Sequence, residues 1–431
     1  MHRAIAVAIA LAWSLQTVAA TDIPPLTFAK DGTFHITLFE DLHMGESAFF
    51  YSSPASSPAG PEQDAKSIAV MNRVLASEYP DLVVLNGDLI TGDHLSKDTS
   101  THYIDLIVQP LLDHNLTWAA TYGNHDSAYN LDRDALLKRE QGWPNSRTRK
   151  MVQGRDAGVT NYYLPIYASG DTDGAGAPEM LLWFFDSRGG TYYQEHKNQP
   201  TWVDKSVAEW FTKTNDELVH KYNKEIPSLI FVHIPTRVSL VTQTEIDLDP
   251  SREPGMNHDK PMFYQAENYC DDGRQNHKCK GGQDMPFVEA IANTTGVVGV
   301  ISAHDHGLSW CRTWDDQLPG IPDGKGTKLC FGQHTGYGGY GSWIRGSRQI
   351  VLTDSKLADK DFDTWIRLET GEITGSVSLN STYGQDQYPE IKDVKDECPV
   401  CDGLKTPNGD NHRSPAGLAL LLLVFLMQIM I

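Results

Sequence analysis

The sequence has 431 residues, 40% apolar and 21% charged, a globular composition that excludes a chain disordered throughout. Its 36 lysines and arginines are outnumbered by 56 aspartates and glutamates, and the formal charge of −20 argues against binding to nucleic-acid polymers or anionic membranes. A phosphate-bearing substrate remains compatible with this charge if a local positive centre, such as a metal ion, attracts it.

The first 20 residues have the order of a secretory signal peptide. Arg3 precedes an apolar run from Ala4 to Leu15, and residues 18–20 are the small residues of a cleavage site. We therefore expect export and a mature chain that begins at Thr21. A buried N-terminal helix is the alternative.

The last residues resemble a lipid-anchor signal. Leu418–Ile431 is almost wholly apolar, but it is shorter than the roughly 20 residues that a spanning helix needs. Upstream lie the small residues Asn408, Gly409 and Asp410 and a polar spacer. This order predicts that residues 409–431 are a propeptide replaced by a GPI anchor, with a short membrane tail as the alternative. The expected location is extracellular, on the cell surface, with the membrane reached only through this end.

Six cysteines in a chain with an export signal predict an oxidising compartment and disulfide bonds. Among the many pairings, closeness in sequence favours Cys270 with Cys279, Cys311 with Cys330 and Cys398 with Cys401. Three glycosylation sequons agree with export, at Asn115, Asn293 and Asn380. The folded region is expected over residues 21–397, and residues 398–408 form a cysteine-containing stem.

Between these ends, short apolar strands alternate with amphipathic segments, which is typical of an α/β layered fold. Strands are expected at residues 34–39, 82–85, 118–121, 180–185, 229–232, 297–301, 349–352, 364–368 and 372–379. Helices are expected around residues 64–78, 102–114, 204–224 and 284–293. The late strands add an antiparallel end to one sheet, so two mixed sheets flanked by helices fit best. Residues 45–60 and 237–283 lack this alternation and are expected as rim loops, the second a candidate lid.

Residues of metal-ligand types follow the early strands, where ligands of open α/β sheets gather. Asp41 and His43 come first, and their spacing projects both side chains to one side of the chain, where they can chelate one cation. Asp88 follows the second strand after Gly87, which permits a sharp turn and leaves a carboxylate able to bridge two metals. Taken alone, Asp88 would be interpreted as a helix cap.

The third strand is followed by a more specific cluster. Asn124 offers an amide oxygen ligand, His125 an imidazole for acid–base chemistry, and Asp126 a carboxylate that can fix the imidazole's tautomer. His233 ends a later apolar strand, and alone it would be interpreted as a core histidine.

A second pair, His304 and His306, has the same spacing as Asp41 and His43. In this order the residues resemble the signature of calcineurin-like metallophosphoesterases, over residues 34 to 306. The flanking sequence is similar to the fungal and plant subgroup of purple-acid-phosphatase-like proteins, in the segments Asn161–Pro165, Phe184–Ser187 and Thr335–Gly341.

This resemblance implies the metallo-dependent phosphatase fold, a four-layer α/β/β/α sandwich, and two divalent metal ions. It implies one metal held by Asp41, His43, Asp88 and His306, and a second held by Asp88, Asn124, His233 and His304. Nitrogen and oxygen ligands without thiolate suit Zn, Mn or Fe. By the same resemblance, His125 would protonate the leaving group or stabilise the equatorial charge, and Asp126 would hold its other nitrogen.

Some positions depart from the family pattern or lie outside it. Thr91 stands where purple phosphatases carry a metal-binding tyrosine, so no iron–tyrosinate centre is expected, and Ala303 stands where glycine is usual. Arg237 and His334 are candidates to reach a substrate phosphate, with a surface or loop position as the simpler alternative. The glycines of residues 336–341 are interpreted as a tight loop near the site.

We therefore expect a secreted or surface-anchored phosphoester hydrolase that uses a metal-activated water for in-line attack on phosphorus. A phosphomonoesterase is the first hypothesis, and a phosphodiesterase acting on nucleotides or lipid headgroups would use the same metal clamp. A catalytically silent metal- or phosphate-binding protein is a different alternative, which the missing tyrosine supports. Against it, every motif position holds a chemically competent residue.

Overall fold

The computed structural model describes residues 23–46, 60–92, 95, 97–127, 131–245, 248–259, 263–270, 274–279, 281–314 and 318–391. The expected signal peptide, the pair Cys398 and Cys401, the stem and the anchor signal lie outside these residues, as does most of the segment 45–60. In the part of the chain that is described, no helix combines the length and the apolar character needed to cross a membrane.

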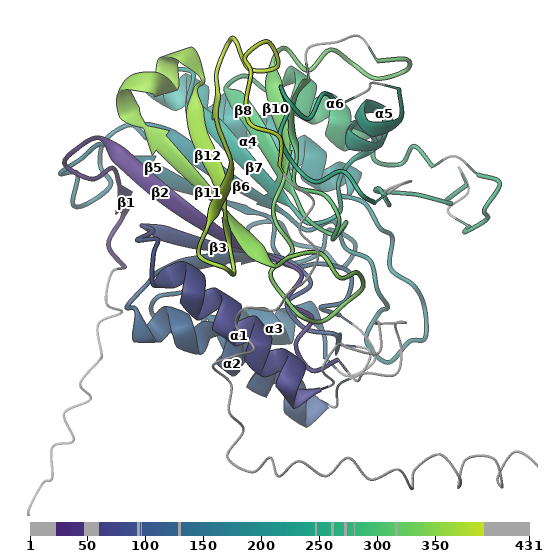
Figure 1. Ribbon diagram of the computed structural model, residues 1–431. Helices are drawn as coiled ribbons and strands as arrows, with labels where there is room; N and C mark the ends of the chain where they lie inside the picture. The colour runs from purple at the N-terminus through teal and green to yellow at the C-terminus, as the bar shows by residue number, and fades with distance from the viewer. Residues whose placement is uncertain are drawn as a thin grey trace, which may run out of the picture.

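Two β-sheets lie face to face at the centre of the molecule (Figure 1). One has seven strands, in the order β1 (Leu26–Thr27), β5 (Tyr162–Tyr167), β6 (Met180–Phe185), β7 (Ser228–Val232), β8 (Val297–Ser302), β10 (Thr327–Phe331) and β9 (Cys311–Trp314). The other has six, in the order β13 (Ile373–Leu379), β12 (Phe362–Leu368), β11 (Gly346–Thr353), β2 (Thr33–Phe39), β3 (Leu82–Asn86) and β4 (Trp118–Thr121). Each sheet has a parallel centre and an antiparallel end.

Helices cover the outer face of each sheet. The six-stranded sheet is covered by α1 (Pro61–Leu75), α2 (Lys97–Asp113) and α3 (Arg133–Glu140). The seven-stranded sheet is covered by α4 (Lys205–Tyr222), α5 (Arg237–Glu245) and α6 (Met285–Asn293), and a 3₁₀ helix, η2 (Asp354–Asp359), joins β11 to β12. The molecule is therefore the expected four-layer α/β/β/α sandwich.

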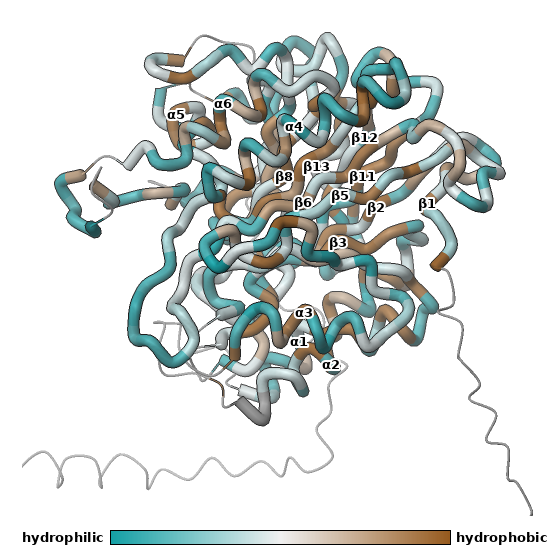
Figure 2. The backbone as a smooth tube through the Cα atoms, turned by 180° about the vertical axis from the view of Figure 1, so that it is seen from behind, coloured by the Kyte–Doolittle hydropathy of each residue, from teal (hydrophilic) through white to brown (hydrophobic). Residues whose placement is uncertain are grey.

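The alternation of side chains along each strand explains the layers. In β6, Leu182 and Phe184 enter the core between the two sheets, whereas Leu181, Trp183 and Phe185 pack under α4 and α6. Because both faces are covered, the whole strand is buried and reads as one apolar run. Figure 2 shows this apolar character along the central strands of both sheets.

The rim differs from expectation in one place. Residues 237–283 do not form a loop throughout, because their first part is α5. Val238 of this helix is fully buried against the α4–α6 side of the sandwich, which fixes it to the fold. Among the described residues of the remaining part, Gln265 donates its backbone N–H to Pro235 after β7 at 2.8 Å, and His258 donates to Gly307 after β8 at 3.0 Å.

Two of the expected disulfides are present in the described residues. Cys270 is bonded to Cys279, and Cys311 to Cys330. The second bond joins β9 to β10 at directly paired positions. The sequon residues Asn115 and Asn293 are exposed, and Asn380 is partly exposed, with its side-chain oxygen accepting a hydrogen bond from the Thr382 backbone at 2.9 Å.

Candidate metal centre

The expected ligands converge where parallel strands of both sheets end. Asp41 and His43 follow β2, Asp88 follows β3, Asn124 follows β4, His233 follows β7, and His304 and His306 follow β8. Because the carboxyl ends of these strands meet at one edge of the sandwich, residues more than 250 positions apart come together.

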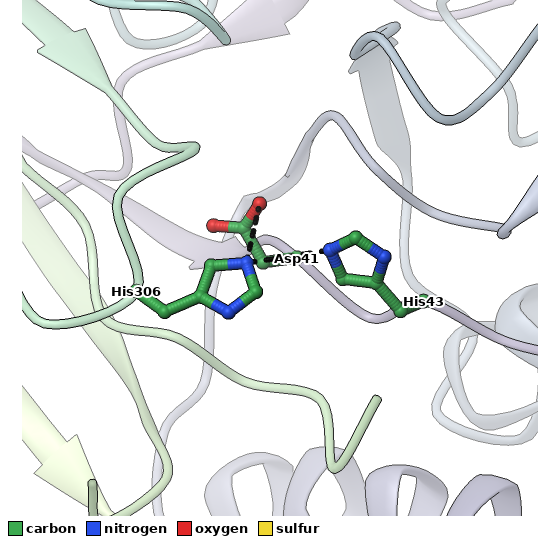
Figure 3. Close-up of side chains that lie close together, drawn as sticks. All are labelled: Asp41, His43 and His306. Atoms are coloured by element: carbon green, nitrogen blue, oxygen red, sulfur yellow. Dashed lines mark hydrogen bonds and ion pairs between the residues drawn. The ribbon is translucent and has the colours of Figure 1, made fainter. Parts of the chain in front are cut away.

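One part of the site is formed by Asp41, His43 and His306, whose ligand atoms all lie within 4.8 Å of one another. Figure 3 shows the two rings on either side of Asp41. His306 Nε2 lies 3.6 Å from Asp41 Oδ1 and 3.3 Å from His43 Nε2. We call this the enclosed half of the site.

The other part is formed by Asp88, His233 and His304. Asp88 Oδ2 lies 3.0 Å from His233 Nε2 and 3.8 Å from His43 Nε2, so this carboxylate belongs to both halves. The side-chain oxygen of Asn124 is buried without a hydrogen-bond partner in the described residues. We call Asn124, His233 and His304 the open half.

The histidine rings are oriented for metal binding. Nδ1 of His233 lies 2.9 Å from the carbonyl oxygen of Asn86, and Nδ1 of His306 lies 2.8 Å from that of Tyr340. A carbonyl oxygen only accepts, so both Nδ1 atoms carry a hydrogen, and both Nε2 atoms face the site, where each would offer a lone pair to a metal ion once its ring is neutral. His43 Nδ1 lies 3.2 Å from the Thr91 hydroxyl, the position without the family tyrosine.

These lone pairs and carboxylates fit cations placed between them. Asp41 Oδ1 and Asn124 Oδ1 are buried with no hydrogen-bond partner in the described residues. Buried polar atoms without partners are costly, and a cation beside them would supply the missing interaction. Two divalent cations would satisfy every one of these atoms.

The electrostatics also favour a positive charge. Burial alone would lower the pKa of His233, but the Asp88 carboxylate outweighs it and raises that pKa to about 10. Burial would raise the pKa of Asp88, but the neighbouring His233 and His125 hold it well below its usual value. Burial and then repulsion from His233 lower the pKa of His304 to about 3.

The backbone is strained at four of these residues. Asp41, His43, Asp88 and His304 have φ angles of 51°, 47°, 47° and 77°, in the left-handed region that non-glycine residues rarely adopt. Each such residue costs on the order of 1–2 kcal/mol, and clusters of them are typical of functional sites. Backbone bonds hold the strain in place, from Asp41 N to Gly87 O at 3.0 Å and from His43 N to Asp88 O at 2.9 Å.

The glycine-rich loop of residues 336–341 closes the enclosed half. Gly339 has φ 74°, and a Cβ there would overlap the His306 ring. The His306 ring lies between the rings of Tyr340, at 4.1 Å, and His334, at 3.8 Å. The expectation of a tight loop near the site is therefore confirmed.

The two weaker candidates do not line the cavity beside the metal centre. His334 is fully buried behind His306, with Nε2 3.1 Å from the Gly338 carbonyl oxygen. Arg237 is the first residue of α5, and its backbone N–H donates to Asp284 at 2.8 Å. Neither position supports direct contact with a phosphate bound at the open half.

Asp126 has a role that the sequence did not indicate. One carboxylate oxygen accepts from the backbone N–H of Leu89 at 2.7 Å and of Ile90 at 3.0 Å, and the other accepts from that of Gly123 at 2.7 Å. Asp126 thus ties the loop after β3 to the loop after β4. The expected contact of Asp126 with the His125 ring stays a prediction.

His125 lies inside the cluster rather than outside it. Its ring centroid is 5.0 Å from that of His43, and a ring nitrogen groups with ligand atoms of His43 and Asp88. Its backbone N–H donates to Asp88 Oδ1 at 2.7 Å. The open half adjoins a cavity of about 520 Å³, which Asn124, His125 and His304 line on one side.

The comparison with known families agrees with this geometry. Residues 34–308 match the calcineurin-like phosphoesterase family. This chain belongs to that family. The calcineurin-like phosphoesterase match covers every candidate ligand but ends before the glycine-rich loop.

Individual relatives refine the placement. "Probable inactive purple acid phosphatase 14" of Arabidopsis thaliana is 26% identical over 363 residues, covering 80% of each chain. "Phosphatase DCR2" of Saccharomyces cerevisiae is 27% identical over 349 residues, covering 78% of this chain and 54% of that protein. These relatives are consistent with the purple-acid-phosphatase-like subgroup. A solved structure, a dimetal phosphatase from Danio rerio, matches with a TM-score of 0.50 and 14% identity over 80% of this chain and 98% of that chain, a likeness of fold.

Proposed function

We propose that this protein hydrolyses phosphomonoesters at a dinuclear metal centre. The observation that carries the proposal is the set of buried, unpartnered ligand atoms around Asp88, which faces both halves of the site. Two divalent cations held there would supply Lewis acidity, polarising the phosphoryl group and activating a water for in-line attack on phosphorus. Zn, Mn and Fe all suit the nitrogen and oxygen donors.

The chain's own residues would then bind, orient and transfer a proton. The cavity beside Asn124 and His304 would receive the ester, with its phosphate at the open half. His125 lines that cavity and lies beside Asp88, which supports a role for its imidazole in giving a proton to the leaving oxygen. Asp126 joins the loops after β3 and β4, and would thereby hold His125 and Asp88 in fixed positions relative to each other.

Replacing His125 with alanine tests the proposal. General acid catalysis typically contributes 10²- to 10⁴-fold, so we expect about that loss in kcat on p-nitrophenyl phosphate. The two metals per chain should remain, as measured by elemental analysis of the same sample. His220→Ala, an exposed histidine on α4, is the matched control and should leave both values unchanged. A variant that keeps full activity would exclude His125 as the acid.

Two alternatives have distinct signatures in the same assay. A phosphodiesterase would prefer bis-p-nitrophenyl phosphate over the monoester. A catalytically silent binding protein, which the word "inactive" in the names of three plant relatives favours, would bind two metals and turn over neither ester at any pH. Because its ligand positions are all filled, we place the enzyme first.

We also propose that the protein is exported and held at the cell surface by a lipid anchor, with a phosphoester as its partner and no nucleic-acid polymer. Two disulfides and exposed sequon asparagines at positions 115 and 293 support the secretory route. Glycosidase treatment should shift the mass of the protein. A phosphatidylinositol-specific phospholipase should release it from cells, whereas retention after that treatment would favour a membrane tail.

A further inference from the structure

One wall of the cavity beside the open half is formed by residues that are not candidate metal ligands. Residues of the stretches 263–269 and 275–277 also line the cavity, and the disulfide between Cys270 and Cys279 joins these two stretches. A substrate whose phosphate lies at the open half would press its leaving group against this wall. The wall therefore determines which leaving groups are accepted.

Hydrogen bonds fix the wall to the loops that carry the ligands. The Gln265 side chain is fully buried, with its N–H donating to the Ile234 carbonyl at 2.8 Å and its oxygen accepting from Val203 N at 3.0 Å. Ile234 follows His233 directly, so the wall and the open half share one support. At the other end, the Tyr269 hydroxyl donates to the Gln199 carbonyl at 3.2 Å.

Aromatic side chains dominate the apolar part of this wall. Phe263 is 52% exposed, and its ring centroid lies 6.4 Å from that of the ligand His304. The Phe263 backbone N–H donates to Asp305 Oδ1 at 3.0 Å, which holds the ring beside the cavity. Tyr264 and Tyr269 also line the cavity. An exposed phenyl ring next to a metal ligand gains free energy when an apolar ligand covers it.

The charged part of the wall is acidic. Glu267 lines the cavity, where burial raises the pKa of its carboxyl and the nearby His277 opposes that rise. Among the lining residues that the structure describes, the ionisable side chains besides tyrosines are Glu267 and histidines, with no lysine or arginine. The formal charge of −20 has the same sign. A second anionic group on the leaving group would thus meet repulsion from Glu267.

We infer that the substrate carries one phosphate on a leaving group that has no further negative charge and presents an apolar or aromatic face to Phe263. Polyphosphates, and esters of carboxylated or multiply phosphorylated alcohols, would be poorer substrates because of the same wall. This inference rests on the proposed function, because it assumes that the phosphate is bound at the open half. Glu267 and Phe263 are the specificity-determining residues.

The test compares two substrates that differ in one charge. The kcat/KM for phenyl phosphate should exceed that for 4-carboxyphenyl phosphate by on the order of tenfold, the effect of one nearby like charge in a partly solvated cavity. Glu267→Lys should bring the ratio to about one or invert it. Glu209→Lys makes the same charge change at an exposed site on α4 and should leave the ratio as in the wild type. Phe263→Ala should raise KM for both esters, whereas Tyr79→Ala, at an 83% exposed aromatic, should not.

Binding measurements distinguish a failure of the proposed function from a failure of the inferred substrate selectivity. The affinities of phenylphosphonate and 4-carboxyphenylphosphonate, which cannot be hydrolysed as esters, are measured by calorimetry on the metal-loaded full chain. No turnover of either ester with a retained preference for phenylphosphonate would refute the proposed function and support the selectivity inferred here. Equal affinities and equal kcat/KM, or the same shift in Glu209→Lys as in Glu267→Lys, would overturn the inference.

Discussion

The two halves of the candidate metal centre use similar ligands but have different surroundings. In the enclosed half, the His306 ring is packed between Tyr340 and His334, and Gly339 lies against it. In the open half, Asn124 and His304 line a cavity of about 520 Å³. Packing on both faces of a ring fixes its direction, whereas a ligand beside a cavity leaves coordination positions for other molecules.

The difference suggests a division of labour. The enclosed half would hold its ion tightly and set the geometry, and the open half would exchange water, phosphate and leaving group. Asp88 couples the two, since its Oδ2 atom lies within 4 Å of a histidine from each half. Substitutions that affect only one half therefore test whether the halves have separate roles, and substitutions of Asp88 test whether the halves depend on each other.

Among the substitutions that compare the two halves, Asp88→Asn is expected to have the largest effect. The amide retains the size of the side chain and can still accept the His125 backbone N–H, but it removes the negative charge shared by both halves. We expect kcat to fall about 10²- to 10³-fold, the cost of removing one preorganised electrostatic contact, together with loss of metal from both halves. Elemental analysis and the monoester assay measure both. Full metal content with full activity would show that the halves are independent of Asp88.

A smaller effect confined to the enclosed half is expected for Thr91→Val. This change removes the hydroxyl 3.2 Å from His43 Nδ1 while conserving volume. Loss of such a partner typically lowers metal affinity about 10- to 100-fold, so a chelator should remove one metal equivalent at lower concentration. At saturating metal, kcat should be unchanged. Thr294→Val is the control, because that buried hydroxyl at the end of α6 has no partner in the described residues.

The smallest effects separate the cavity wall from the sandwich interior. Replacing Cys270 and Cys279 with alanine opens the wall and should raise KM severalfold, with kcat retained. Replacing Cys311 and Cys330, between β9 and β10, should leave KM unchanged. Closing loops of this size stabilises a fold by about 2–4 kcal/mol, so thermal unfolding should detect both losses. If loss of either disulfide changes KM to the same extent, the cavity wall has no specific role in substrate binding.

Much of the fold could be predicted from the sequence, because a strand that is buried on both faces consists of a continuous run of apolar residues. The strand expected at residues 180–185 is β6 to the residue, and those at 82–85 and 297–301 are each short by one. Some elements that lack such an apolar run were not predicted. β9 at Cys311–Trp314 has a partly exposed, polar centre, and α5 has too few apolar residues to mark its period.

The site was predictable where position along a strand decides it. A polar residue just after a buried strand must lie at the sheet edge, so spacing located the ligands. Spacing does not identify hydrogen-bond partners, and the contacts of Asp126 with backbone amides were therefore not predicted. Tyr340 and Phe263 were not singled out, because their contacts with His306 and His304 depend on folding of distant loops. In the sequence, the close spacing of Cys270 and Cys279 was the feature that could have indicated the cavity wall.

The glycine-rich loop has a consequence for how the molecule is made. The family match ends at residue 308, and every candidate ligand lies before that point. Yet β2 is paired on one side with β11, which begins at Gly346, and Gly339 contacts both His43 and His306. During synthesis, the ribosome must pass these positions before the centre can close, so folding waits on contacts of very long sequence separation. A chain interrupted after residue 308 would carry the complete motif without a finished site.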